Sequence, residues 1–202
     1  MYLNNHSYYS LRYGTYSIDA IIKEASKRNI GAMALTDINN STGMIDFVRT
    51  CKENKIKPIG GMEFRDGDEL LFTGIARNNE GFRELNEYMS SINLKEKKYS
   101  LSAPIFNNVY VLYPFLKNDE HKLKDNEFIG IKPSQVHKLI SLNSNVITKM
   151  VVQQPVTFSD SATWYLHKNL RAIDHNILLS HLKSHMHAPN DETFISENDI
   201  IN

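Results

Sequence analysis

Three residues in the first third of the chain carry side chains that bind divalent metal ions: His6, Asp37 and Glu63. Imidazole and carboxylate groups together suit Zn²⁺ or Mn²⁺, and a water bound to such an ion loses a proton near neutral pH. Each residue is expected at the end of a strand, and the carboxyl ends of parallel strands face one crevice. The three side chains could therefore converge on a hydrolytic metal site.

The same side chains also have a purely structural interpretation. In it, His6 hydrogen-bonds a backbone carbonyl, Asp37 caps the following loop over residues 38–42, and Glu63 pairs with a nearby cation. Spacing alone favours this structural interpretation, because polar residues at strand ends commonly serve such purposes. Both interpretations stay open at this point.

The elements that must position these residues alternate between strands and helices. Apolar periodicity predicts helices over 18–25 and 44–51 and strands over 31–36, 58–64 and 70–76. Ser17 is a predicted N-cap, and Asp66-Gly67 is a turn signal. Alternation of this kind is typical of parallel sheets built from βαβ units, including closed barrels.

The alternation continues in the second half of the chain. It predicts a helix capped by Asn79, strands over 108–113 and 145–152, and helices around 136–140 and after Ser159. We expect a domain of residues 1–180 and a polar segment of residues 181–202, in which Pro189 breaks any helix. The polar ending suggests that this segment leads into the rest of a longer chain.

Composition excludes several classes of protein. Lys plus Arg and Asp plus Glu both number 23, so no overall positive field attracts nucleic acid. Cys51 is the single cysteine, which excludes an internal disulfide and a thiolate zinc cluster and fits a reducing compartment. No apolar run approaches the ~20 residues of a membrane helix. We expect a cytoplasmic protein without a membrane segment.

Four ordered segments resemble the signatures of the polymerase and histidinol phosphatase (PHP) domain: residues 4–11, 34–40, 56–64 and 75–82. More narrowly, they resemble its version at the N-terminus of bacterial DNA polymerase III alpha subunits. The similarity thins after residue 90 and returns at 166–179 and 194–200. The resemblance implies an α/β fold with a distorted (β/α)7-type barrel, whose intact members bind metal ions through histidines and carboxylates.

This sequence departs from the family's metal-binding pattern at most positions. His6 and Glu63 match family ligands, and Asp37 is adjacent to another. By the resemblance, the substituted ligand positions are Asn4, Ile38, Leu71, Val156 and Phe158. Amide and apolar side chains bind transition metals poorly, and zinc sites usually need three protein ligands. We therefore expect no metal and no catalytic residue in this domain, and an interior filled by packing.

The resemblance implies the N-terminal module of a replicative DNA polymerase, in which nucleotidyl transfer with Mg²⁺ and contact with DNA belong to the parent protein. The module itself is expected to be a structural and docking unit. Its implied partners are the rest of the polymerase chain, the proofreading exonuclease subunit and other replisome proteins. No membrane partner is expected.

Two alternatives stay open. A metal-dependent phosphoesterase or 3′–5′ exonuclease would hold Zn²⁺ or Mn²⁺ with the three residues named first and further ligands, such as His121 or His137. A regulatory module that binds a phosphate or nucleotide without cleaving it would use Arg12 and Lys57 as anion contacts.

Two further clusters have a functional and a structural interpretation. The four histidines of residues 175–187 could place two imidazoles on one helix face, although a solvated terminal segment is favoured. The tyrosines of residues 8–16 could stack single-stranded nucleic acid with Arg12, although filling of a barrel mouth or an interface is favoured.

Overall fold

The computed structural model describes residues 1–115, 123–141 and 147–195. The strands in these ranges are β1 Asn4–Asn5, β2 Ala32–Leu35, β3 Lys57–Asp66, β4 Glu69–Ala76, β5 Val109–Pro114, β6 Glu127–Ile131, β7 Met150–Val152 and β8 Pro155–Val156. The helices are α1 Ile18–Lys27, α2 Met44–Glu53, α3 Asn79–Leu94 and α5 Ser161–Asp174, and the 3₁₀ segments are η1 Pro133–Ser141, η2 Leu179–His181 and η3 Ser184–Met186.

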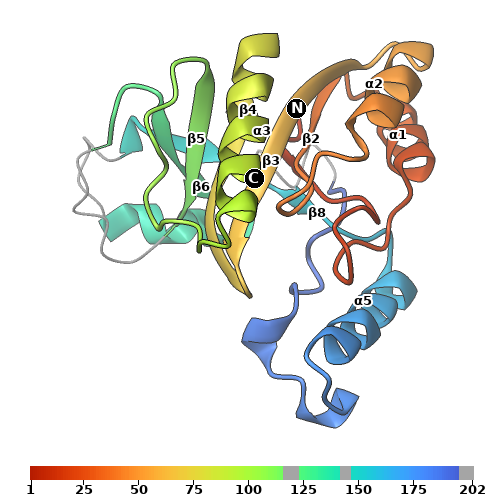
Figure 1. Cartoon of the computed structure of the whole chain (residues 1–202). Helices are drawn as coiled ribbons and strands as arrows, with labels where there is room; N and C mark the ends of the chain where they lie inside the picture. The colour runs from red at the N-terminus through yellow and green to blue at the C-terminus, as the bar shows by residue number, and fades with distance from the viewer. Residues whose placement is uncertain (116–122, 142–146, 196–202) are drawn as a thin grey trace.

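The strands form two sheets, and the larger of them curls around an interior (Figure 1). β2 to β7 make a six-stranded sheet in chain order, and β1 pairs in parallel with β8. The Thr36 amide donates to the Asn5 carbonyl at 3.0 Å, which places β1 beside β2. Only Gln153 and Gln154 separate β7 from β8, so the last strand of the larger sheet leads directly into the smaller sheet. The predicted α/β fold with a distorted barrel is confirmed.

The alternation of strands and helices predicted a parallel sheet, but the sheet is only partly parallel. β3 and β4 form an antiparallel hairpin, and β4 and β5 are antiparallel as well. The hairpin follows from the Asp66-Gly67 turn, where Gly67 has a φ of +59°, a conformation that glycine adopts readily. The barrel is therefore distorted at β4, which runs against both of its neighbours.

Helix caps explain where most of the helices begin. The Ser17 side chain accepts a hydrogen bond from the Ala20 amide, as predicted for α1. In α3 the cap is Asn78 rather than Asn79, because the Asn78 side chain accepts from the Gly81 amide at 3.0 Å.

Two elements of the second half differ from prediction. The expected helix around 136–140 is the 3₁₀ segment η1. Of the strand expected over 145–152, only Met150–Val152 is a strand among the described residues, since β6 offers it partners only from Ile129 to Ile131. Residues 142–146 lie outside the described ranges.

Apolar packing covers the sheet with helices (Figure 1). Ile21 and Ile22 of α1 and Phe47 of α2 are fully buried against β2. Each such side chain contributes about 1.5–3 kcal/mol on burial. The boundary predicted at residue 180 stays a prediction, but Phe194 beyond it belongs to the same cluster, with its ring centroid 5.0 Å from that of Tyr2.

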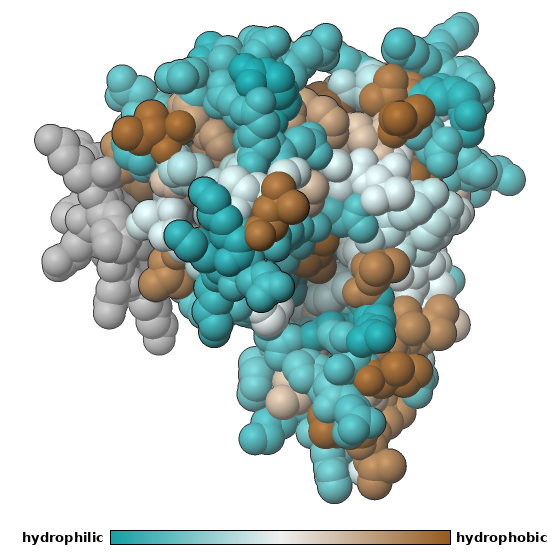
Figure 2. Space-filling model, viewed as in Figure 1, coloured by the Kyte–Doolittle hydropathy of each residue, from teal (hydrophilic) through white to brown (hydrophobic). Residues whose placement is uncertain are grey.

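α5 leaves a strip of apolar side chains in contact with solvent. The helix buries His167, Arg171 and Ala172, whereas Ile173 is 66% exposed. Figure 2 shows apolar residues on the lower right of the molecule, where α5 lies in Figure 1. The exposed side chains of α5 and the turn that follows it are Tyr165, Leu166, Ile173, Leu178 and Leu179. We define these five residues as the α5 strip.

The helices were also compared with the requirements of the bilayer. Within residues 1–115, 123–141 and 147–195, no helix combines the length and the apolar character that a membrane-spanning helix needs.

Candidate functional site

His6 and Glu63 meet inside the barrel. His6 follows β1, Glu63 lies in β3, and His6 Nε2 is 3.2 Å from Glu63 Oε2. Both side chains are buried, with exposures of 1% and 0%. His6 Nε2 is among the buried polar atoms that have no hydrogen-bond partner in the described part of the chain. The two residues converge as their places at strand ends predicted.

Glu63 pairs with a cation two residues along the same strand. Arg65 Nε lies 2.6 Å from Glu63 Oε1, and Asn4 Nδ2 donates to Glu63 Oε2 at 2.9 Å. Burial acts to raise the pKa of Glu63, but Arg65 and then His6 more than offset it, so this pKa lies well below its usual value. Glu63 is therefore an ionised carboxylate in the interior, and the expectation that it pairs with a cation is confirmed.

Arg65 in turn packs against an aromatic ring. Its guanidinium carbon lies 4.4 Å from the centroid of the Tyr13 ring, and Nη2 donates to the Tyr13 hydroxyl at 3.0 Å. Only 12% of the Arg65 side chain is exposed. Sequence analysis missed Arg65, although an acidic and a basic residue two apart on a strand share one face of the sheet.

A second buried carboxylate, Glu192, lies on the other side of His6. Thr157 Oγ1 is 2.9 Å from His6 Nδ1 and donates to Glu192 Oε2 at 2.6 Å. Lys132 Nζ donates to Glu192 Oε1 at 2.9 Å. Burial acts to raise the pKa of Glu192, but Lys132 and then His6 lower it overall. Glu192 was missed because it stands in the predicted polar tail, where no local pattern marks a buried acid.

Asp37 is buried but does not face Glu63. Its carboxylate accepts hydrogen bonds from the Ser7 amide at 2.7 Å, the Ser7 hydroxyl at 2.8 Å and the Ser10 hydroxyl at 2.7 Å. Burial raises the pKa of Asp37, and the bonds from Ser10 and Ser7 offset only part of this. The structural interpretation predicted that Asp37 caps the loop of residues 38–42, and this was wrong. Asp37 instead holds the loop after β1, which contains Ser7 and Ser10.

The substituted ligand positions are spread over several parts of the core. Asn4 is the polar member and donates to Glu63, as described above. Ile38 and Phe158 share one apolar cluster beside the site. Leu71 and Val156 belong to two other clusters. Apolar packing therefore fills the flank of the site through Ile38 and Phe158.

The two predicted anion contacts lie at opposite ends of the barrel. Arg12 is in the loop after β1, and its Nη1 lies 3.0 Å from Oδ1 of Asp174 on the protein surface. Lys57 is the first residue of β3, which runs in the same direction as β1 and β2. These two cations therefore do not face a common site.

The tyrosine and histidine clusters do not form single surfaces. Tyr13 and Tyr16 are buried, whereas Tyr8 is 47% exposed. His181 and His185 are exposed on two separate 3₁₀ segments, which excludes a shared helix face and agrees with the favoured solvated segment. The short segments arise because Pro189 and the polar residues before it do not sustain a longer helix.

His137, one of the two further candidate ligands, does not reach the site. His137 is exposed on η1, and His121 lies outside the described residues, as do positions 196–200 of the last resembling segment. Among the described residues, no group of three or more His, Cys, Asp or Glu side chains is arranged to hold a metal ion.

His167 of α5 is a buried histidine that sequence analysis did not single out. Its Nδ1 donates to the Tyr13 carbonyl at 2.6 Å, and its Nε2 accepts from the Ala188 amide at 2.8 Å. These two bonds require the neutral ring. Burial lowers the pKa of His167 to about 4. His167 thus ties α5 and the segment around Ala188 to the ring that packs on Arg65.

The free energy of unfolding is expected to fall as the pH drops from 7 to 5. In the unfolded chain His167 gains a proton near its ordinary pKa of 6.5, but in the folded protein only near 4. Between these values the unfolded state binds more protons, so acid favours it, by on the order of 3 kcal/mol once the pH is below both values. Urea unfolding at pH 7, 6 and 5 measures this slope. His167→Gln should flatten it and the exposed His185→Gln should not, and equal slopes in all three proteins would contradict the prediction.

Curated proteins similar to this chain are DNA polymerase III alpha subunits. The subunit of Halalkalibacterium halodurans is 33% identical over 105 residues, which are 48% of this chain and 9% of that protein. The subunit of Ureaplasma parvum is 39% identical over 90 residues (45% and 9%), and that of Staphylococcus aureus strain COL is 31% identical over 127 residues (60% and 12%). This chain therefore spans about a tenth of the length of these relatives.

Solved structures give weaker matches. An amidohydrolase from Chromobacterium violaceum has a TM-score of 0.37 at 20% identity, over 47% of this chain and 34% of that chain. A candidate metal-dependent phosphoesterase from Bifidobacterium adolescentis has a TM-score of 0.38 at 10% identity, over 98% of this chain and 93% of that chain. These TM-scores are too low to carry an argument about this chain.

A family model matches enough of the chain to assign it to a family. The sequence model of the PHP domain matches residues 3–124, which is more than half of the chain and contains Asn4, His6, Asp37, Glu63 and Arg65. The match also covers the strands β1 to β5. The chain therefore belongs to the PHP domain family.

Proposed function

We propose that this chain is the PHP module of a bacterial DNA polymerase III alpha subunit, and that it serves DNA replication as a non-catalytic structural and docking unit. Similarity to alpha subunits of three genera supports the parentage. In this proposal, DNA-directed DNA synthesis with Mg²⁺ and contact with DNA belong to the rest of a longer cytoplasmic protein.

The observation that carries the non-catalytic part is the pairing of Glu63 with Arg65. A metal ion held by His6 and Glu63 would stand beside the guanidinium, and two positive charges in a buried site repel each other strongly. Arg65 already supplies the positive charge that a metal ion would offer to Glu63. Since zinc and manganese sites need more donors than this pair leaves, we propose no cofactor for this domain.

Metal retention and turnover test this proposal together. After incubation with excess Zn²⁺ or Mn²⁺ and gel filtration, the protein is expected to keep no stoichiometric metal. It is also expected to release no phosphate from phosphomonoesters and no nucleotide from single-stranded DNA. The matched variant carries Asn4→His and Arg65→Gln, which restores an imidazole and removes the cation. Metal retained by this variant and not by the wild type would attribute the loss to these two positions.

A metal-dependent phosphoesterase or 3′–5′ exonuclease is the second candidate function, and one observation favours it. The buried Nε2 atom of His6 lies beside Glu63 Oε2 and has no hydrogen-bond partner among the described residues. Stoichiometric metal in the wild type, with turnover that His6→Ala abolishes, would establish this function and overturn the non-catalytic one.

The docking part of the proposal rests on exposed apolar surface. The α5 strip is of a kind that marks contact with other proteins. We propose the rest of the polymerase chain, the proofreading exonuclease subunit and other replisome proteins as partners. Gel filtration of the chain mixed with the purified exonuclease subunit of the same bacterium tests one of them, and separate elution of the two proteins would remove that subunit from the proposal.

A further inference from the structure

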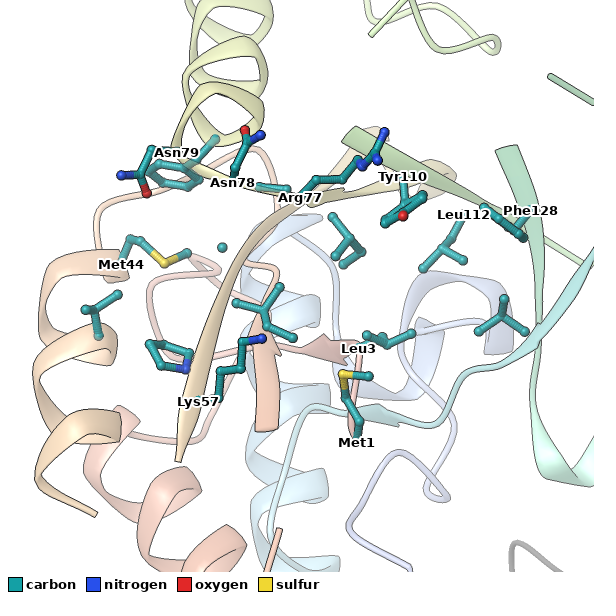
Figure 3. A pocket seen from close by; sticks show the side chains of 18 of the residues that line it. Met1, Leu3, Met44, Lys57, Arg77, Asn78, Asn79, Tyr110, Leu112 and Phe128 are labelled. Carbon is teal, nitrogen blue, oxygen red and sulfur yellow. The ribbon is translucent and has the colours of Figure 1, made fainter. Parts of the chain in front are cut away.

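A groove of about 710 Å³ opens at the end of the barrel opposite to His6 and Glu63 (Figure 3). It lies where β3 and β5 begin and where β4 ends, whereas Glu63 stands in the second half of β3. Its floor is apolar and is formed by Leu3, Ile59, Ile75, Leu112 and Val151. Most of these side chains are only partly buried, so the groove exposes the end of the barrel core.

Three cations surround this floor. Lys52 comes from the end of α2, Lys57 from the start of β3, and Arg77 follows β4. The guanidinium carbon of Arg77 lies 5.1 Å from the centroid of the Tyr110 ring, which keeps that charge at the edge of the groove. Within residues 1–115, 123–141 and 147–195, no Asp or Glu lines the groove. An occupant with negative charges would therefore find complementary charge and no repelling carboxylate.

The cations flank the groove and do not converge on one point. Figure 3 shows Arg77 beside Tyr110 along one side of the groove, and Lys57 along the other. A single phosphate group needs several donors around one centre. An apolar floor with charges along both sides fits an amphipathic segment of a protein better, since such segments place apolar residues in a groove and charged residues at its rim.

Aromatic walls add to the case for a protein segment. Tyr110 and Phe128 meet edge to face, with centroids 5.9 Å apart, and Phe82 forms another wall. Phe82 lies directly on Gly60, where a Cβ would come within 2.9 Å of its ring. Aromatic and arginine side chains are the types that contribute most to binding at protein interfaces.

We propose that this groove docks an acidic amphipathic segment of a partner protein. The segment lays its apolar residues on the floor and sets its carboxylates against Lys52, Lys57 and Arg77. This inference gives the proposed docking role a second surface, separate from the α5 strip, and rests on that role alone. It concerns the opposite end of the barrel from the metal-ligand positions, so the result of the metal experiment leaves it unchanged.

Fluorescence anisotropy with designed peptides tests the proposal on the full chain. The probe is an amphipathic helical peptide of about five turns with Glu on both flanks of an apolar face. We expect saturable binding of this peptide, and affinity about tenfold or more lower for the same peptide with Lys in place of Glu. We expect a similar loss, about tenfold or more, for the acidic peptide with the Lys57→Glu/Arg77→Glu protein.

The matched control is Lys95→Glu/Lys97→Glu, which makes the same change in net charge. These exposed lysines follow the far end of α3, whose 16 residues place Lys95 about 24 Å from Asn79 at the edge of the groove. The control should bind the acidic peptide as the wild type does. Val151→Asp, which adds a negative charge to the floor, gives a second variant should Lys57→Glu/Arg77→Glu fail to fold, and it should abolish binding.

Three outcomes would overturn the proposal. The first is equal affinity of the wild type and the groove variants, or no saturable binding of the acidic peptide. The second is competition by a mononucleotide, which would assign the groove to a small anion. The third is self-association of the chain that Lys57→Glu/Arg77→Glu abolishes, which would assign the groove to a second copy.

Discussion

Replacing Arg65 with methionine is expected to lower the free energy of unfolding by about 3–5 kcal/mol at neutral pH. Methionine keeps an unbranched apolar side chain over Tyr13 but leaves the buried Glu63 carboxylate without the guanidinium that lies 2.6 Å from it. Burial, which raises the pKa of Glu63, is then opposed mainly by His6. Denaturant unfolding of the purified variant measures the loss.

Acid should affect the two proteins in opposite ways at this site. In the wild type the pKa of Glu63 is lowered, so its contribution is complete above the ordinary value of 4.5 and is lost only as the pH falls through the lower folded pKa. In Arg65→Met the pKa of Glu63 should be raised. Protonation then relieves the buried charge, so the difference in the free energy of unfolding between wild type and Arg65→Met should shrink as the pH falls from 7 to 5.

Two companion variants make the Arg65 prediction specific. Arg65→Met combined with Glu63→Gln removes both charges and should recover most of the lost stability, because no unpaired charge stays in the interior. Arg12→Met breaks the exposed pair with Asp174 and should cost less than about 1 kcal/mol. A loss in Arg65→Met no larger than in Arg12→Met would contradict the assignment of Arg65 to a buried ion pair.

Replacing Gly14 with alanine is expected to cost more than about 3 kcal/mol or to prevent folding. A Cβ on Gly14 would lie 1.9 Å from the Ser7 carbonyl oxygen, a backbone atom that no rotamer change can move away. The Ser7 amide and hydroxyl also donate hydrogen bonds to the buried Asp37 carboxylate. Displacing Ser7 would therefore break two hydrogen bonds to a buried charge. Thermal unfolding followed by circular dichroism measures the effect.

Gly31→Ala is the matched control for this prediction. A Cβ on Gly31 meets no atom within 4 Å, and its backbone is not in the left-handed region. The substitution should change the free energy of unfolding by less than about 1 kcal/mol. Similar melting temperatures for the two alanine variants would refute the role given to the contact between Gly14 and Ser7.

Elements with their own periodicity could be predicted from the sequence. α1, α2, β2 and β3 were predicted because each buries a regular set of apolar residues. β6 and β8 were not predicted. β8 has only two residues, and its register depends on Asn4 and Asn5, which are far away in the sequence. The expectation of a parallel sheet also failed at β4, because the hairpin turn between β3 and β4 reverses the chain direction.

The site was predictable only where it follows strand ends. His6 and Glu63 were placed together on that ground, and their contact is 3.2 Å. Thr157 contacts His6 although it lies 151 residues later in the chain, and Glu192, which accepts a hydrogen bond from Thr157, lies later still. No local pattern reveals such a separation. Arg65 is different, because it lies two residues from Glu63 and only its burial could not be foreseen from the sequence.

The pairing of β1 with β8 sets an order for folding during protein synthesis. Pro155 and Val156 leave the ribosome about 150 residues after their partners Asn4 and Asn5. Until then the edge of β1 that β8 covers has no partner strand, and Glu192 has still to arrive beside Thr157. The nascent domain must therefore wait, with an open edge on β1 that invites wrong pairing, until β8 and Glu192 have been translated.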